Sequence, residues 1–287
     1  MTPGRPLPTW HLVWERVAKY LHPRLVTKDD SSLAREVCRK RLGGPETQKE
    51  NSLATFVLVH GAFHGSWSWK RVRNALQAAG HEVFTPTLTG LGERSHLNSP
   101  NVNLSTHILD VINLIKWEEL SNVVLCGHSY GGCVISGVAE QLNGSIRALV
   151  YVEGFVLEDG ESLMDLFPPE QVNQARQQAQ TAGDGWKILP FPASILGTNS
   201  ADVDWVDAQL TPQPIASFEE PLLFAKRSPE VADVLHILAT GYESPFPIAA
   251  AHERAKKRGW ATRTVSCGHE VMLDRPDDLT KLLLEYV

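Results

Sequence analysis

The stretch V-V-L-C-G-H-S-Y-G-G, residues 123–132, joins an apolar run to a serine that has a glycine two positions away on either side. The pentapeptide 127–131 fits the pattern G-x-S-x-G, in which a strand ends, the chain turns sharply and a helix begins at once. A serine in such a turn projects its hydroxyl above the sheet, beside helix N-terminal amides that favour negative charge. We therefore predict that Ser129 is a nucleophile rather than an incidental serine in a tight turn.

The sequence around this motif alternates between two kinds of pattern. Residues 55–60 form a continuous apolar run, which is typical of a strand covered on both faces. Alternating strands and helices predict parallel βαβ units and a doubly wound α/β sheet. The other strand patterns lie at 81–85, 122–126, 146–152, 234–239 and 261–265, and the helix patterns at 69–79, 104–115, 131–142, 248–258 and 276–286.

Two segments depart from this alternation. Residues 1–50 carry an apolar stripe at helical spacing, which predicts an N-terminal helical arm. The arm either packs on the main domain or a partner subunit, or it shields the mouth of the site. Packing on a partner subunit would support a homodimer. Residues 155–230 are rich in proline, glutamine and isolated aromatic residues. They predict a helical cap inserted into a main domain of residues 51–287.

The composition excludes several classes of function. The chain has 287 residues, 43% of them hydrophobic, and a net charge of -6, so it lacks the basic excess of a nucleic-acid-binding protein. No apolar run reaches the roughly 18 residues of a membrane span, and the N-terminus has no apolar signal core, so we expect no membrane and a cytoplasmic protein. The four cysteines match no zinc or disulfide pattern, so we expect no metal; Cys126 and Cys133 are expected to be buried thiols.

A nucleophilic serine needs a base and an oxyanion hole. In this architecture the histidine follows the serine and the acid in the chain, and His269 lies just after the last predicted strand. We predict that His269 is the base, and that the main-chain N–H groups of Ala62 and Tyr130 form the oxyanion hole. His64, beside the oxyanion loop, either supports that loop or is a surface residue.

Three longer segments resemble a known superfamily. Residues 56–69, F-V-L-V-H-G-A-F-H-G-S-W-S-W, are similar to the opening of the plant methylesterase and hydroxynitrile lyase branch of the α/β-hydrolase superfamily. Residues 88–94, L-T-G-L-G-E-R, and 268–275, G-H-E-V-M-L-D-R, resemble esterases and lactonases near that branch. The resemblance covers residues 54–287. It implies the α/β-hydrolase fold, a cap over the site, no cofactor, and hydrolysis of carboxylic esters or lactones.

Two positions depart from the lyase branch. That branch has a threonine in the position of Gly61 and a lysine in that of Glu270. The differences argue against cyanohydrin cleavage.

The acid of the triad has two candidates. The superfamily usually places it after the penultimate strand, where Glu243 is the only acid nearby. Glu153 ends the strand that follows the nucleophile helix, and zearalenone-type lactonases resemble the chain in having a glutamate there. We favour Glu153 and keep Glu243 as the alternative.

The substrate is expected to be apolar. Phe63, Trp186, Phe191 and Trp205 are the predicted substrate-binding residues, although aromatic residues in a cap also form its own core. We therefore predict a serine hydrolase that cleaves esters or lactones of hydrophobic alcohols through an acyl-enzyme. The alternatives are a C–C bond hydrolase or lyase on the same scaffold and a non-catalytic binder of hydrophobic small molecules.

Overall fold

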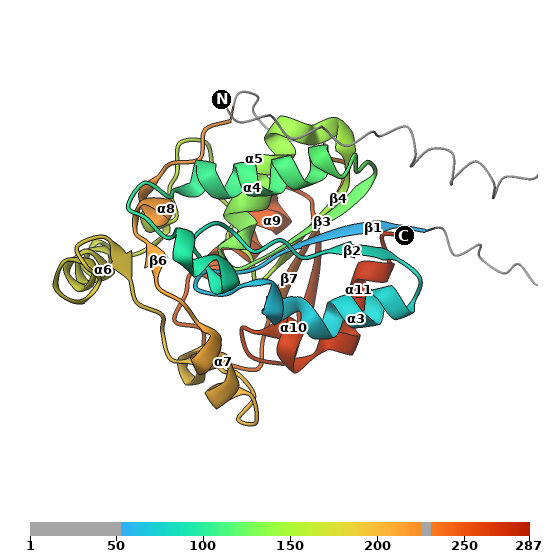
Figure 1. The fold of residues 1–287 in the computed structure, drawn as a ribbon. Helices are drawn as coiled ribbons and strands as arrows, with labels where there is room; N and C mark the ends of the chain where they lie inside the picture. The colour runs from blue at the N-terminus through green and yellow to red at the C-terminus, as the bar shows by residue number, and fades with distance from the viewer. Residues whose placement is uncertain (1–52, 225–230) are drawn as a thin grey trace, which may run out of the picture. The chain divides into compact units, whose positions relative to one another are not determined.

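A computed structural model describes residues 53–224 and 231–287, so the predicted helical arm of residues 1–50 lies outside the described residues. The described chain is built on a six-stranded sheet in the order β2-β1-β3-β4-β7-β8, in which every neighbouring pair is parallel (Figure 1). This sheet confirms the predicted doubly wound α/β fold. Its strands are β1 (Thr55–Val59), β2 (Glu82–Phe84), β3 (Val123–His128), β4 (Ile146–Val152), β7 (Asp233–Ala239) and β8 (Ala261–Val265).

Helices cover both faces of the sheet. One face carries α4 (Leu104–Trp117), α5 (Gly131–Leu142) and α9 (Ile248–Lys257), and the other carries α3 (Lys70–Ala78), α10 (Val271–Asp274) and α11 (Pro276–Leu284) (Figure 1). In β1, Val57 and Val59 belong to the first core, whereas Phe56 and Leu58 belong to the second. Burial on both faces explains why β1 reads as a continuous apolar run.

The segment between β4 and β7, residues 153–232, is a long insertion. It contains α6 (Pro169–Ala182), α7 (Val203–Gln209), α8 (Ala216–Glu219) and a two-stranded antiparallel sheet of β5 (Lys187–Ile188) and β6 (Gln213–Pro214). The sequence pattern predicted helices only, because strands of two residues are too short to show a period of two. Short 3-10 helices lie at Ser66–Trp69, Gly92–Leu97, Asn143–Ser145, Met164–Leu166 and Ala193–Leu196.

The strand order determines where a ligand can bind. The chain adds β2 on one side of β1 and β3 on the other, so the connections diverge between β1 and β3. Ligands of doubly wound proteins bind at such a point, at the carboxyl ends of the strands. The loops that follow β1, β3, β4 and β8 at this edge carry Ala62, Ser129, Glu153 and His269. Within the described ranges, no helix combines the length and apolar character that crossing a membrane requires.

Candidate active site

Ser129 lies in a sharp turn between β3 and α5. Its φ is +52°, a left-handed conformation that costs a non-glycine residue about 1–3 kcal/mol. The flanking glycines make the turn feasible, because a Cβ on Gly127 would lie 2.5 Å from the Gly131 carbonyl oxygen. A Cβ on Gly131 would lie 2.7 Å from the Val59 carbonyl oxygen. The predicted strand–turn–helix geometry around the serine is therefore present.

Hydrogen bonds tie this turn to the end of β4. The Ser129 N–H donates to the Val152 carbonyl (3.1 Å), and the Ser129 carbonyl accepts from the Phe155 N–H (3.1 Å). Glu153 lies between these partners, and its own N–H donates to the Ile237 carbonyl (2.8 Å). The φ of Glu153 is also left-handed, at +48°. Two strained residues, each directly after one of two neighbouring strands, are thus held side by side, as is common at active sites.

The Glu153 carboxylate contacts His269. Glu153 Oε2 lies 3.1 Å from His269 Nδ1, and both side chains are buried. Since a carboxylate accepts hydrogen bonds, Nδ1 carries the proton and Nε2 of the neutral ring is left as a proton acceptor. The other carboxylate oxygen, Oε1, accepts from the Ala239 N–H at 2.5 Å. The carboxylate is therefore fixed by the neighbouring strand β7.

A tyrosine that the sequence analysis missed joins this pair. The Tyr242 hydroxyl donates to Glu153 Oε2 at 2.9 Å and lies 3.2 Å from His269 Nδ1. Burial and the charge of Glu153 raise the pKa of Tyr242, so the hydroxyl stays protonated and can donate. Tyr242 follows β7, in the loop where the superfamily usually places the acid.

Glu243, the alternative acid, is placed differently. Its side chain is exposed, and within the described ranges no hydrogen bond or ion pair joins it to His269. Of the two candidate acids, the structure brings only Glu153 to the histidine.

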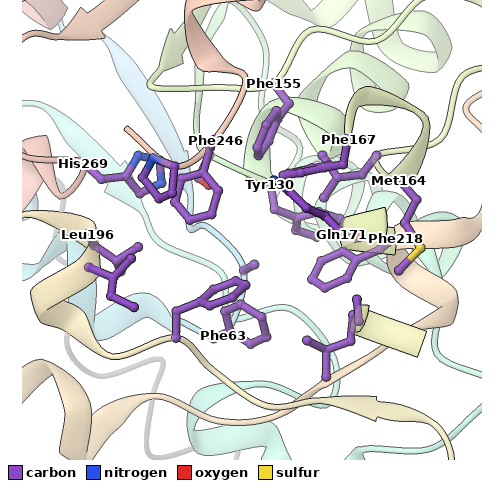
Figure 2. A pocket seen from close by; sticks show the side chains of 18 of the residues that line it. Phe63, Tyr130, Phe155, Met164, Phe167, Gln171, Leu196, Phe218, Phe246 and His269 are labelled. Carbon is purple, nitrogen blue, oxygen red and sulfur yellow. The ribbon is translucent and has the colours of Figure 1, made fainter. Parts of the chain in front are cut away.

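The carboxyl ends of the strands open into a cavity of about 500 Å³. Ser129 and His269 both line it, together with Ala62 and Tyr130. Figure 2 shows Phe63, Tyr130, Phe218 and Phe246 around the same space as His269. The lining is mainly apolar, and one wall comes from α6 of the insertion. Such a cavity suits an apolar ligand oriented by a few polar groups.

Two of the four predicted substrate-binding residues line the cavity. They are Phe63 and Phe191, whose rings meet edge to face at 5.8 Å between centroids. Within the described residues, the lining does not include Trp186 or Trp205. Trp205 packs on Trp67 at 5.1 Å, and Trp186 lies beneath the Lys187 ammonium group. An isolated aromatic residue in the sequence gives no signal that separates these two uses.

The loop after β1 is fixed by a residue from β6. Phe63 has a φ of +67°, and its N–H donates to Oε1 of the buried Gln213 at 2.9 Å. Gln213 Nε2 in turn donates to Ser217 Oγ at 2.8 Å. In the described part of the chain, the main-chain N–H groups of Ala62 and Tyr130 form no internal hydrogen bond. Both predicted oxyanion donors are therefore free to bind a ligand in the cavity they line.

A buried cluster of titratable groups lies next to this loop. His64 is 3% exposed, which rules out a surface position, and its Nδ1 lies 2.6 Å from the Ala62 carbonyl oxygen. Its Nε2 lies 3.2 Å from Oε1 of the fully buried Glu270. Burial disfavours both charged forms, but the attraction of Glu270 outweighs it and raises the pKa of His64. The charge of His64 likewise holds the pKa of Glu270 well below its usual range.

One set of side chains in the described ranges has the spacing of metal ligands. Donor atoms of His128, His269 and Glu270 lie within 4.8 Å of one another. One nitrogen of each histidine is engaged, since His128 Nε2 donates to the His269 carbonyl and His269 Nδ1 faces Glu153, while Glu270 lies at ion-pair distance from His64. A cation bound there would also meet the charge of His64, so the set fits a metal poorly.

The buried histidines predict a loss of stability in mild acid. Burial lowers the pKa of His60 and His128 to about 3 and that of His107 and His236 to about 4. The unfolded chain takes up these protons near pH 6.5, so their contribution is present above pH 6.5 and lost as the pH falls. Each histidine adds up to about 1.4 kcal/mol per pH unit to the slope of the free energy of unfolding against pH.

Urea unfolding between about pH 7 and pH 5, where most carboxylates stay ionised, measures this slope. In His107→Gln the slope of the free energy of unfolding against pH should fall by the share of one histidine, up to about 1.4 kcal/mol per pH unit. This change in slope is expected even if the substitution alters the free energy of unfolding itself. His64, whose pKa is raised, acts in the opposite direction, because its contribution is complete below pH 6.5 and is lost as the pH rises. A free energy of unfolding that is flat over this range would contradict the neutral state of the four buried histidines.

Comparison with known proteins identifies the family. Residues 56–282 match a model described as the alpha/beta hydrolase family. A carbendazim hydrolyzing esterase from Nocardioides sp. (strain SG-4G) is 43% identical over 239 residues, which cover 80% of this chain and 98% of that protein. Putative methylesterase 13, chloroplastic, from Arabidopsis thaliana is 26% identical over 85% of this chain, but the match spans only 57% of the plant protein.

A solved structure agrees with these sequence matches. It is an extracellular α/β-hydrolase from a Paenibacillus species, described as sharing structural and functional homology with tobacco salicylic acid binding protein 2. It is 26% identical with a TM-score of 0.71, over 81% of this chain and 98% of the other. This chain therefore belongs to the α/β-hydrolase family, as its motifs predicted. Within that family it is a carboxylic ester hydrolase.

Proposed function

We propose that this chain hydrolyses esters or lactones of hydrophobic alcohols through an acyl-enzyme formed on Ser129. His269 is the base, Glu153 is the acid that orients it, and the Ala62 and Tyr130 amides bind the oxyanion. The observation that carries the proposal is the 3.1 Å contact between the Glu153 carboxylate and His269 Nδ1. This contact leaves Nε2 available beside the cavity that Ser129 and His269 both line.

The reaction proceeds in two halves. Ser129 Oγ attacks the ester carbonyl carbon while its proton passes to His269 Nε2, and the carbonyl oxygen becomes an oxyanion bound by the two amides. The bond to the alcohol then breaks, and the alcohol leaves with the proton from His269. Water attacks the acyl-enzyme with His269 again as the base, and the acid leaves as Ser129 regains its proton. Throughout, the Glu153 carboxylate stabilises the imidazolium form of His269.

The cavity supports an apolar substrate. Its volume of about 500 Å³ lies within the usual range of roughly 300–1,000 Å³ for small-molecule sites. The insertion acts as a cap, with Val172 and Ala175 of α6 facing the site from the side of the insertion. The names of the relatives support ester cleavage, of carbendazim in the bacterial protein and of methyl esters in the plant protein; because the alcohol of a methyl ester is methanol, the hydrophobic alcohol in the proposal rests on the cavity alone.

Turnover of a substrate panel tests the proposal. The panel contains p-nitrophenyl esters from acetate to octanoate, carbendazim, a set of lactones and a β-diketone. We expect ester or lactone turnover, with a preference for apolar substrates over charged ones. Cleavage of the β-diketone without ester or lactone turnover would favour the C–C bond hydrolase, and tight binding of apolar ligands without any turnover would favour the non-catalytic binder. Either result would overturn the proposal.

A substitution in α6 is expected to change chain-length preference. Ala175 lines the cavity, so the added ring in Ala175→Phe should exclude long acyl chains. We expect the ratio of kcat/KM for octanoate to that for acetate to fall about tenfold or more. Ala182→Phe is the matched control, since Ala182 is exposed at the end of the same helix. An unchanged ratio in Ala175→Phe would show that the acyl chain does not occupy this cavity.

A further inference from the structure

The two ring nitrogens of His64 face two hydrogen-bond acceptors. Nδ1 lies 2.6 Å from the Ala62 carbonyl oxygen and Nε2 lies 3.2 Å from Glu270 Oε1. The ring also stacks on Trp67 at 5.1 Å between centroids, which fixes the plane of the imidazole. A carbonyl oxygen never donates and an ionised carboxylate only accepts. Nδ1 therefore donates to the carbonyl, and a second proton on Nε2 would place a positive charge at ion-pair distance from an ionised Glu270.

Glu270 depends on this histidine for its compensation. Its side chain is 0% exposed, and in the described chain no N–H or O–H group donates a hydrogen bond to either carboxylate oxygen. A buried carboxylate with neither hydrogen bonds nor a cation is very costly. The cationic partner within ion-pair distance is His64. The depressed pKa of Glu270 and the raised pKa of His64 agree with a charged pair.

The neighbouring histidines do not take over the role of the cation. His60 accepts from the Leu88 N–H through Nε2 (3.0 Å) and donates through Nδ1 to the Gly61 carbonyl (2.8 Å), which is the pattern of a neutral ring. His128 donates through Nε2 to the His269 carbonyl, and its Nδ1 is buried without a partner. His269 itself faces Glu153 through Nδ1. Within residues 53–224 and 231–287, His60, His128 and Glu270 are the titratable side chains that interact with His64.

The pair joins the two loops that the proposed reaction needs. His64 holds the carbonyl of Ala62, whose N–H is the proposed oxyanion donor, and Glu270 is the residue that follows the proposed base. We propose that His64 is a permanently protonated positioning residue, whose imidazolium is clamped between the Ala62 carbonyl and Glu270 and fixes the oxyanion loop relative to the His269 loop. The positioning role of His64 rests on the proposed function, whereas its protonation state does not.

Histidine ring NMR tests the protonation state directly. ¹⁵N-labelled wild-type protein is titrated from about pH 6 to pH 9, with His64→Gln to assign the resonance. At about pH 8 an ordinary histidine, with a pKa near 6.5, carries almost no second proton. We expect the His64 ring to remain doubly protonated there, and to remain so in Ser129→Ala. A His64 ring with only one proton at pH 8 would overturn the inference.

Kinetics test the positioning role. In Glu270→Gln the cation loses its partner while the side-chain volume is kept, so we expect kcat to fall about 10- to 100-fold with KM changed less than about threefold. His64→Gln should show the same split, and the double variant should lose little more than either single one. Glu285→Gln, which removes an exposed ion pair with Arg263, is the matched control and should behave as wild type.

The outcomes separate this inference from the proposed function. A doubly protonated His64 in a protein that turns over no ester would leave the buried pair standing and reject the proposed function. If the protein hydrolyses esters and Glu270→Gln keeps a normal kcat, or changes only KM, the positioning role is rejected. If Glu270→Gln does not fold, the wild-type titration and the kinetics of His64→Gln decide.

Discussion

Ser129→Ala is expected to lower kcat for ester hydrolysis by about 10⁴- to 10⁶-fold, because no other group in the proposed mechanism can form the acyl-enzyme. The substitution removes one oxygen from a side chain that lines a cavity, and the polar contacts that hold the turn come from the main chain of Ser129. The folded structure should therefore persist, with a melting temperature close to that of wild type. Turnover of p-nitrophenyl acetate and thermal unfolding of the same preparation measure the two effects.

The control for this variant is Ser95→Ala, which removes an exposed hydroxyl from the 3-10 helix Gly92–Leu97. Its kcat should match that of wild type. If Ser129→Ala retained a tenth or more of the wild-type kcat, the hydrolysis would not proceed through an acyl-enzyme on this serine. Water activated directly by His269 would then be the better account.

Glu153→Gln is expected to lower kcat by about 10³- to 10⁴-fold. The glutamine cannot supply the negative charge that stabilises the imidazolium, and an amide nitrogen turned toward His269 would select the wrong ring tautomer. Its oxygen can still accept from the Ala239 N–H, so the end of β4 should keep its conformation. Steady-state kinetics on the same ester measure the loss, and circular dichroism checks the fold.

Glu243→Gln provides the matched comparison. The substitution is the same, but Glu243 is exposed and makes no contact with His269 in the described chain, so kcat should stay near the wild-type value. A large loss in Glu243→Gln together with a small one in Glu153→Gln would reverse the assignment of the acid.

Tyr242→Phe should lower kcat far less than Glu153→Gln does, since it removes one hydrogen bond to the carboxylate and leaves the charge of the carboxylate.

The sequence predicts most of this fold because its signals are local. The four inner strands, β1, β3, β4 and β7, lie close to their apolar runs, since they are buried on two faces and need no alternation to be recognised; the edge strands β2 and β8 are more exposed. The turn at Ser129 is also local, because the two glycines that permit it lie within the same pentapeptide. The missed elements of the described chain are short: β5, β6, α10 and the 3-10 helices have two to six residues, too few for a periodic pattern, and the helices of the insertion were predicted only as a cap without bounds.

The remaining site residues could not be found in this way, because their contacts span long sequence separations. Tyr242 reaches Glu153 across 89 positions, and Gln213 reaches the Phe63 amide across 150. Neither residue belongs to a local motif, and a buried glutamine in a polar-rich insertion gives no composition signal. The sequence showed Glu270 only as a departure from the lyase branch, and its pairing with His64 became visible once the loops after β1 and β8 were placed together.

The most direct test of the central claim is to map the covalent intermediate on Ser129. The protein is treated with an organophosphonate p-nitrophenyl ester, which phosphonylates an activated serine and cannot be hydrolysed quickly, and the adduct is located by peptide mass spectrometry. The triad predicts one adduct per chain, on the peptide that contains Ser129, absent in Ser129→Ala and formed much more slowly in Glu153→Gln. An adduct on another residue, or a protein that turns over esters but forms no adduct on Ser129, would contradict the assignment.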